Sequence, residues 1–393
     1  MPWRECDPMH ERIQFVLLIQ QGEHSMTELC DLFEISRKTG YKWLRRYRQY
    51  GPAGLNDFSR APHTIPHKAP DDVVQFVRDT MNKHPYWGGR KVRDYAYKIA
   101  PDLEMPSETT VSSIIFREGL KKSKQKRKRP GHPGKPIFPT EDIHDLWTTD
   151  FKGEFKTLNG EYCYPLTIMD EHTRFIIEIK GFPSINQEKV MNVFKDAFKK
   201  HGIPKAIKSD NGAPFASIGI ARLSKLSAWW IKLGILPVLT QPASPGQNSY
   251  HERMHKTLKE ETAIPPARDL AAQNRKFRMW MEEYNFDRPH ESLNGDFPCE
   301  YYEPSPRKFD PAISRIKYPQ HFEVRRVSRN NCMRWKNNYI SIGSVLNDEY
   351  LGLEPVADGI WAVWFSWKRI GFFDESKMKI VDTYGKTGRK KNV

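Results

Sequence analysis

The sequence predicts a multidomain protein, with all-α modules first, a central α/β domain next, and a small all-β barrel last. Three observations support this order. Apolar residues recur at helical spacing up to about residue 120, and strand and helix patterns alternate from Leu146 onward. After residue 306, β-forming residues alternate with Asn, Asp and Gly turns. A chain of 393 residues is also too long for a single compact core.

The composition favours a polyanionic partner. The chain has 63 Lys and Arg residues against 48 Asp and Glu, a net charge of +15, and DNA, RNA and anionic membranes all fit this charge. No apolar stretch is long enough to span a membrane, and no secretion signal is present, so we expect a cytoplasmic protein. The five cysteines are scattered, and they predict neither disulfides nor a zinc site.

Residues 1–60 are predicted to form a helix-turn-helix domain of three short helices. The second helix opens with Ser25-Met-Thr-Glu28, the spacing of a capping box, and Ser36 is placed to cap the third. The third helix is rich in basic residues, which we expect to contact DNA, although a solvated basic face is the alternative. These DNA-binding candidates are Arg37, Lys38, Lys42, Arg45 and Arg46.

Residues 61–120 are predicted to form a second helix-turn-helix or winged-helix-like module, with one helix from Asp71 and another beginning near Ser107. Residues 121–136 then form a basic linker without apolar residues for a core. We expect this linker to follow a phosphate backbone, with a nuclear-localisation tract as the competing interpretation. Its DNA-binding candidates are Lys126, Arg127, Lys128 and Arg129.

The central domain, residues 137–305, is predicted to be α/β, and residues 306–393 to be a DNA-binding β-barrel. Strands are expected at 146–157, 162–169, 174–180, 206–209 and 236–240, and helices at 187–200, within 218–234, from about 248, and at 268–285.

Three acidic residues of the central domain are candidate metal ligands. Asp150 lies in an apolar β-run, where a carboxylate is costly to bury without a cation or hydrogen bonds. Asp210 ends a strand and precedes an Asn-Gly turn, and Glu252 lies on the first turn of an amphipathic helix. Oxygen ligands favour Mg²⁺ or Mn²⁺ over zinc.

Five motifs together resemble transposases of bacterial insertion sequences, whose catalytic core is shared with retroviral integrases. The motifs are WTTDFKG (147–153), MDEHTR (169–174), SDNGAPF (209–215), SPGQNSYHERMHKTLKEE (244–261) and YNFDRPHESL (284–293). The resemblance implies an RNase H-like core with an Asp-Asp-Glu triad of Asp150, Asp210 and Glu252. The interval from Asp210 to Glu252 is slightly longer than usual, and a helix within 218–234 can absorb the difference.

The resemblance also implies a chemistry and a set of partners. Two metal ions at the triad would support cleavage at the ends of a mobile element and attack of the freed 3′-hydroxyls on target DNA. The implied partners are double-stranded DNA, as terminal inverted repeats and target, and further copies of the chain in a homo-oligomer; association with the nucleoid is expected. Candidates for positioning the DNA end are Asn248, His255, Lys256 and Lys259. Asp170 matches a residue that is not a ligand, and a structural role is expected for it.

Two alternatives remain open. A catalytically inactive, sequence-specific DNA-binding regulator could keep the helix-turn-helix modules after losing activity, although acidic residues at all three triad positions disfavour this. A stand-alone nuclease could use the same fold to hydrolyse nucleic acid without joining, although it would gain little from sequence-specific N-terminal modules.

Overall fold

The computed structural model describes residues 8–58, 69–121, 138, 140–151, 153–240, 249–312 and 315–383. The chain divides into two compact units, Met1–Ala69 and Pro70–Val393. Asn248 and the basic linker candidates Lys126, Arg127, Lys128 and Arg129 lie outside the described residues.

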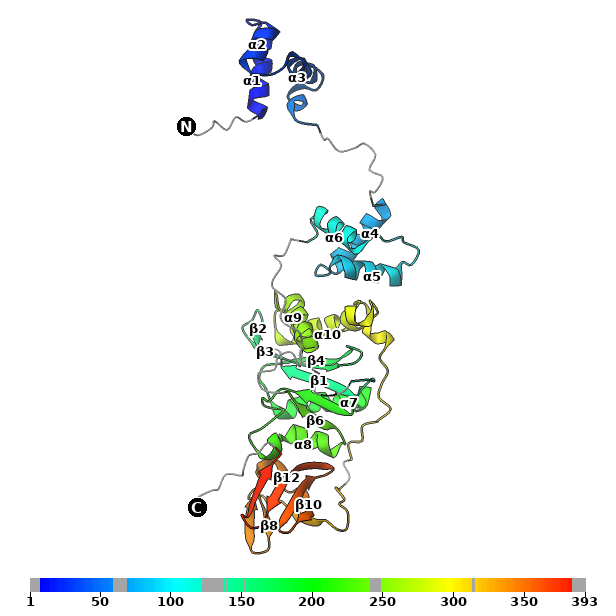
Figure 1. The fold of residues 1–393 in the computed structure, drawn as a ribbon, viewed down its shortest axis with the longest axis vertical. Helices are drawn as coiled ribbons and strands as arrows, with labels where there is room; N and C mark the ends of the chain where they lie inside the picture. Colours follow the sequence, from blue (N-terminus) through cyan, green and yellow to red (C-terminus); the bar gives the residue numbers. More distant parts are fainter. Residues whose placement is uncertain are drawn as a thin grey trace, which may run out of the picture. The chain divides into compact units, whose positions relative to one another are not determined.

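The first unit is a three-helix domain (Figure 1). Its elements are α1 (Pro8–Gln21), α2 (Met26–Leu32), α3 (Arg37–Tyr50) and a 3₁₀ turn at Gly51–Leu55. Phe15, Leu29 and Trp43 are buried at its centre. The predicted capping box is confirmed, because Ser25 and Glu28 each bond to the other's backbone N–H, and Ser36 caps α3 as expected. The helix-turn-helix arrangement predicted for this region is therefore present.

The second unit begins with three more helices, α4 (Asp71–Lys83), α5 (Gly89–Ile99) and α6 (Glu108–Arg117). Ser107 caps α6 by accepting a hydrogen bond from the backbone of Thr110, which confirms the predicted start. Residues 69–121, all of them described, contain no strand, so no wing of the winged-helix type lies within this range. We refer to residues 70–121 as the helical module.

A mixed sheet forms the centre of the α/β core. Its order is β2-β3-β1-β5-β6, with β4 also paired to β3. β1 runs antiparallel to β3 and parallel to β5, and β5 runs parallel to β6. The strands are β1 (Leu146–Phe151), β2 (Phe155–Lys156), β3 (Tyr162–Asp170), β4 (Ile176–Phe182), β5 (Ala206–Ser209) and β6 (Leu236–Leu239). The single strand predicted over 146–157 is thus two separate strands.

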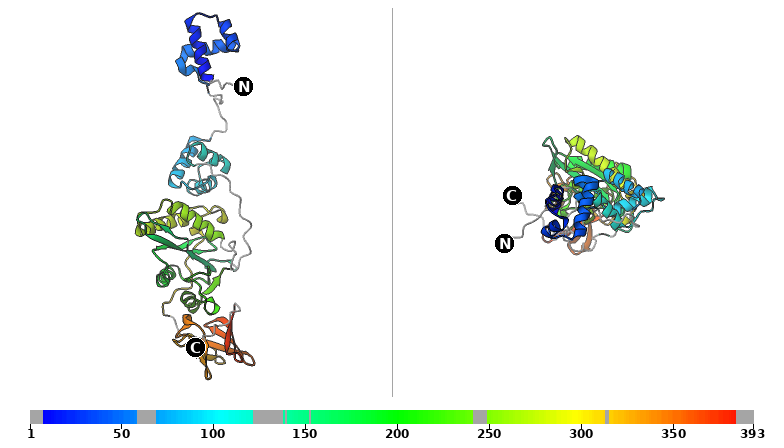
Figure 2. Two further views of the ribbon diagram at one scale, coloured as in Figure 1. Left: turned by 90° about the vertical axis from the view of Figure 1, so that its left-hand side faces the viewer. Right: turned by 90° about the horizontal axis from the view of Figure 1, so that it is seen from above.

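Helices cover both faces of this sheet (Figures 1 and 2). On one face, α7 (Gln187–His201) and α8 (Lys225–Lys232) bury Phe194, Phe198 and Trp230 against Trp147 of β1. On the other face, α9 (Ser249–Thr262) and α10 (Leu270–Phe286) pack against β3 and β4 through Met254 and Phe277. The core is therefore the three-layer α/β domain that the sequence predicts.

The C-terminal region is all-β, but its described strands do not close into the predicted barrel. They form an open sheet of order β13-β12-β11-β10-β7 and a separate β8–β9 hairpin. The strands are β7 (Glu323–Arg326), β8 (Cys332–Trp335), β9 (Asn338–Ser341), β10 (Tyr350–Ala357), β11 (Ile360–Phe365), β12 (Lys368–Asp374) and β13 (Lys379–Asp382). Their apolar cluster includes Leu223, Ala228 and Ile231 from the segment around α8, so the sheet buries apolar surface against the core as well as within itself.

We predict that Gly202→Ala destabilises the core by about 1–3 kcal/mol. Gly202 follows α7 with φ 72° and ψ −173°, a conformation that only glycine adopts readily, and a Cβ there would lie 2.7 Å from the backbone oxygen of Ser305. The measurement is the midpoint of thermal or urea unfolding of the full chain. Gly160→Ala is the control, because Gly160 also has positive φ but nothing within 4 Å of the added methyl. Equal destabilisation by both variants would contradict the steric part of this account.

Candidate active site

The candidate site begins on β1, whose side chains alternate between the two faces of the sheet. Trp147 points into the cluster formed with α7 and α8. Thr148 and Asp150 point to the opposite face, where Thr148 bonds to His251 of α9 and the Asp150 carboxylate lies 3.7 Å from the ring of His255. Asp150 therefore lies beneath the helix that carries Glu252.

The parallel pairing of β1 with β5 brings the second aspartate to the same place. Trp147 lies opposite Ile207, and Thr148 opposite Lys208. Asp210 directly follows β5, and continuing this register by two residues puts it opposite Asp150. The two carboxylates thus extend from the carboxyl ends of adjacent parallel strands, where α/β proteins commonly bind ligands.

The Asp210 carboxylate has little compensation from the protein. It accepts a hydrogen bond from the backbone N–H of Gly212 at 3.2 Å, and within the described part of the chain no cationic side chain pairs with it. Asp210 is exposed to solvent, yet partial desolvation by neighbouring atoms raises the pKa of its carboxyl group above its usual value. An external cation beside Asp210 would offset that cost, so the donor set fits a divalent metal ion.

Two buried histidines hold α9 against the sheet. The Nδ1 atom of His251 lies 2.7 Å from the Thr148 hydroxyl, and its Nε2 atom lies 2.6 Å from the hydroxyl of Thr167. His255 also reaches Thr167, at 2.7 Å. Burial lowers the pKa of His251 well below its usual value, which keeps its ring neutral. His251 was not among the residues predicted from the sequence, although the i, i+4 spacing of two histidines on one helix indicates that they share a face.

Glu252 is placed differently from the two aspartates. Glu252 follows His251 in the first turn of α9 and is exposed to solvent. Among the described side chains, no three His, Cys, Asp or Glu residues are close enough together to hold a metal ion. The structure therefore brings Asp150 and Asp210 to one end of the sheet, with Glu252 on the covering helix but outside a closed ligand group.

The DNA-binding candidates fall into two groups. Arg37, Lys38, Lys42 and Arg45 on α3 are exposed, as are Lys256 and Lys259 on α9. His255 and Arg46 are not. The His255 side chain is buried between Asp150 and Thr167, so in this conformation it contacts the site and not a surface that DNA can reach, a correction to its expected role. Arg46 is half-buried, with its guanidinium 4.0 Å from the ring centre of Phe58.

Two further acidic residues have structural contacts. Asp170 is fully buried and accepts hydrogen bonds from the backbone of His144 and from the backbone and hydroxyl of Thr173, which confirms its structural role. Glu261 lies farther along α9 than Glu252 and forms a buried ion pair with Arg288, from the YNFDRPHESL motif. Neither carboxylate is available to a metal ion in this arrangement.

Comparison with known protein families agrees with this architecture. Residues 143–245 and 233–298 each match a model described as an integrase core domain. Residues 11–63 match a helix-turn-helix domain, and residues 39–115 match a homeodomain-like domain. None of the helices in the described ranges is long and apolar enough to cross a membrane.

The chain is also similar to proteins of bacterial insertion elements. It is 26% identical over 260 residues to a protein of insertion element IS476 from Xanthomonas euvesicatoria, covering 63% of this chain and 70% of that protein. It is 27% identical over 203 residues to a protein of IS407 from Burkholderia multivorans, covering 48% and 66%. It is 30% identical over 194 residues to a protein of IS136 from Agrobacterium fabrum, covering 46% and 93%.

Among solved structures, the chain resembles the HTLV-2 integrase catalytic core domain in complex with magnesium, with a TM-score of 0.33 and 12% identity, covering 43% of this chain and 100% of that one. Together, the domain matches and the insertion-element relatives identify a class of protein that carries an integrase core behind helix-turn-helix domains. The chain belongs to the insertion-sequence transposase family.

We predict that Asp210→Asn stabilises the metal-free protein. Because the raised pKa of Asp210 means that its charged form is disfavoured in the folded state, the asparagine gains stability at pH values above the folded pKa. This gain should shrink as the pH falls through the folded pKa and disappear below the ordinary Asp value of 3.8, where the wild-type carboxyl group becomes protonated in both states. Thermal unfolding in EDTA across this pH range is the measurement. Asp196→Asn, at an exposed position on α7, is the control, and an equal shift in both variants would contradict the prediction.

Proposed function

We propose that this protein is a DNA transposase that binds terminal inverted repeats, cleaves at the element ends and joins the 3′-hydroxyls to target DNA. The observation that carries the proposal is the parallel β1–β5 pairing: Asp150 lies near the end of β1 and contacts His255 of the helix that bears Glu252, and Asp210 directly follows β5. The basic charge of the chain and its insertion-element relatives support the same function.

Asp150, Asp210 and Glu252 are proposed to hold two Mg²⁺ or Mn²⁺ ions. Such ions, when bound, activate the attacking oxygen and stabilise the leaving 3′-oxygen. The support for this proposal is the all-oxygen donor set and the uncompensated Asp210 carboxylate. Since Glu252 lies outside a closed ligand group, we propose that it joins the two aspartates when metal and DNA bind.

Other side chains of the site would orient the ligands and the DNA. Thr167 donates its hydroxyl proton to the backbone oxygen of Asp150 and also contacts His251 and His255, which fixes β1 relative to α9. Lys256 and Lys259 are exposed on the same helix as Glu252, where their charges would attract the phosphates of the DNA end. Asn248, which precedes α9 in the sequence, is proposed to act with them.

The exposed basic residues of α3 are proposed to recognise the inverted repeats, and the basic linker to follow the adjacent backbone. A homo-oligomer is proposed because two element ends must be held together for joining. One observation favours the inactive regulator as a second candidate: the described side chains form no preassembled three-residue metal group. A cleavage assay separates the two functions, because a regulator would bind the ends without cutting them.

We predict that Asp150→Asn, Asp210→Asn and Glu252→Gln each lower the cleavage rate by at least about a thousandfold, because each removes a charged metal ligand. The measurement uses purified full-length protein, Mg²⁺ and labelled DNA that carries the inverted repeats flanking the gene. Glu282→Gln, an exposed site on α10, is the matched control and should cleave like wild type. If the triad variants also cleave like wild type, the assignment is wrong; if wild type binds the ends but never cuts, the regulator is favoured.

We predict that Arg45→Ala weakens DNA binding and reduces the slope of log K against log salt by about one, the effect of losing one phosphate contact. The measurement is fluorescence anisotropy of full-length protein on end DNA over a range of salt concentrations. Arg46→Ala should behave differently, because Arg46 stacks on Phe58 and its loss should lower thermal stability by about 0.5–1 kcal/mol. An unchanged salt slope in Arg45→Ala would remove Arg45 from the DNA interface.

A further inference from the structure

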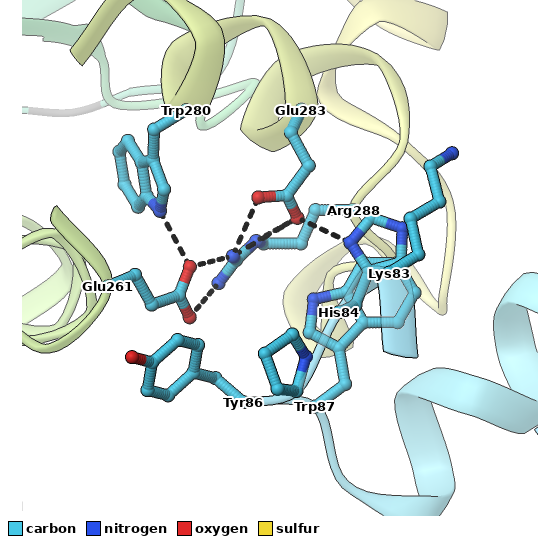
Figure 3. A pocket seen from close by; sticks show the side chains of 9 residues that line it. Lys83, His84, Tyr86, Trp87, Glu261, Trp280, Glu283 and Arg288 are labelled. Carbon is cyan, nitrogen blue, oxygen red and sulfur yellow. Dashed lines mark hydrogen bonds and ion pairs between the residues drawn. The ribbon is translucent and has the colours of Figure 1, made fainter. Parts of the chain in front are cut away.

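The motif YNFDRPHESL contains an arginine that none of the proposed catalytic steps uses. Arg288 of this motif is almost completely buried, with a side chain 3% exposed, and it lies between two carboxylates. One belongs to Glu261 at the C-terminal end of α9, and the other to Glu283 on α10 (Figure 3). A buried guanidinium needs such partners, because an unpaired buried charge is strongly destabilising.

Glu261 is held by more than one bond. Its carboxylate accepts two hydrogen bonds from the Arg288 guanidinium, one at 3.2 Å, and a third from the indole N–H of Trp280 at 2.6 Å. The geometry is that of a guanidinium and a carboxylate joined by paired bonds, which fixes direction as well as distance. The C-terminal end of α9 is therefore fastened to α10 at a defined position.

The same arginine links α9 to the helical module. Arg288 also bonds to Glu283, and the Nδ1 atom of His84, at the end of α4, lies 3.4 Å from the Glu283 carboxylate. We call Arg288, Glu261, Glu283 and His84 the Arg288 cluster. Outside it, the module contacts the core through more exposed ion pairs, such as Arg90 with Glu291 at 2.7 Å and Lys98 with Asp296 at 2.6 Å.

This interface is polar and incompletely packed. A cavity of about 150 Å³ is lined by residues 83–87 of the module and by Glu261, Trp280, Glu283 and Arg288. Exposed ion pairs contribute little to stability, and polar interfaces within a chain commonly permit relative movement. The buried Arg288 cluster therefore connects α4 of the module to α9 through ion pairs and hydrogen bonds of fixed geometry.

We propose that Arg288 and Glu261 are positioning residues for Glu252, and that the helical module sets this position through Glu283 and His84. The inference rests on the proposed function, in which Glu252 completes the metal site. α9 is fastened near Glu252 by His251 and His255, and at its other end by Glu261. A helix held at both ends keeps one orientation, and releasing the Glu261 end leaves only the contacts of His251 and His255, about which α9 can then tilt and rotate. Small changes in the position of a ligand such as Glu252 are enough to impair catalysis.

The test compares Glu261→Gln and Glu283→Gln with the control Glu282→Gln, the same substitution at an exposed position of α10. The first readout is hydrogen–deuterium exchange of the metal-free full chain. We expect faster exchange in α9 for the two test variants and unchanged exchange in β1 and α7. The second readout is the Mg²⁺ concentration for half-maximal cleavage, which should rise about tenfold, with the rate at saturating Mg²⁺ nearly unchanged.

Glu283→Gln keeps the test decisive if Glu261→Gln does not fold, because Glu283 is more exposed than Glu261. The proposal is overturned if α9 exchange and the Mg²⁺ midpoint match those of Glu282→Gln, or if β1 and α7 loosen as much as α9, which would indicate a purely structural role. If wild type does not cleave, the proposed function fails separately. The exchange measurement still tests the cluster: slower α9 exchange in wild type than in Glu261→Gln and Glu283→Gln shows that the cluster fastens this helix.

Discussion

The attachment of α9 to β1 and β3 is the constraint on which the proposed site depends. Polar groups buried at this junction need hydrogen-bond partners, and two helix histidines meet that need by bonding to two threonine hydroxyls of the sheet. Sliding or rotating the helix would leave these groups unpaired in a water-poor interior. The cost of breaking the bonds therefore sets where Glu252 and the exposed lysines of α9 lie relative to Asp150.

The acidic residues near this junction differ chiefly in how their charge is compensated. Asp170 accepts hydrogen bonds from the backbone of His144 and from the backbone and hydroxyl of Thr173, and Glu261 is paired with a buried guanidinium. Asp210 receives a backbone hydrogen bond but no cationic partner from the described residues, and desolvation raises its pKa. A partly desolvated carboxylate without a cationic partner lowers the stability of the metal-free protein. Such destabilising groups are common at ligand-binding sites.

The segment between β5 and β6 connects the core to the C-terminal sheet. Leu223 and Ile231 share an apolar cluster with the C-terminal strands, and the indole N–H of Trp367 bonds to the backbone oxygen of Ile231 at 2.8 Å. Lys232 adds an ion pair with Glu349 at 2.7 Å. The segment between Asp210 and Glu252 thus connects the two residues and also supplies a surface on which the C-terminal sheet packs.

Local patterns in the sequence were sufficient to predict most helices and strands, the caps at Ser25, Ser36 and Ser107, and the three carboxylates as candidates, because these depend on neighbouring residues and on motif chemistry. They also predicted that Asp170 would be structural. Local patterns did not reveal that the C-terminal sheet stays open, because only the folded arrangement decides whether its edge strands β7 and β13 pair with each other. Part of the surface against which this sheet packs comes from α8 and the residues just before it. Nor did local patterns show that His255 turns inward or that Arg288 joins α9, α10 and the helical module. Those positions are determined by pairings between residues distant in the chain, and only the folded arrangement decides which buried polar groups satisfy one another.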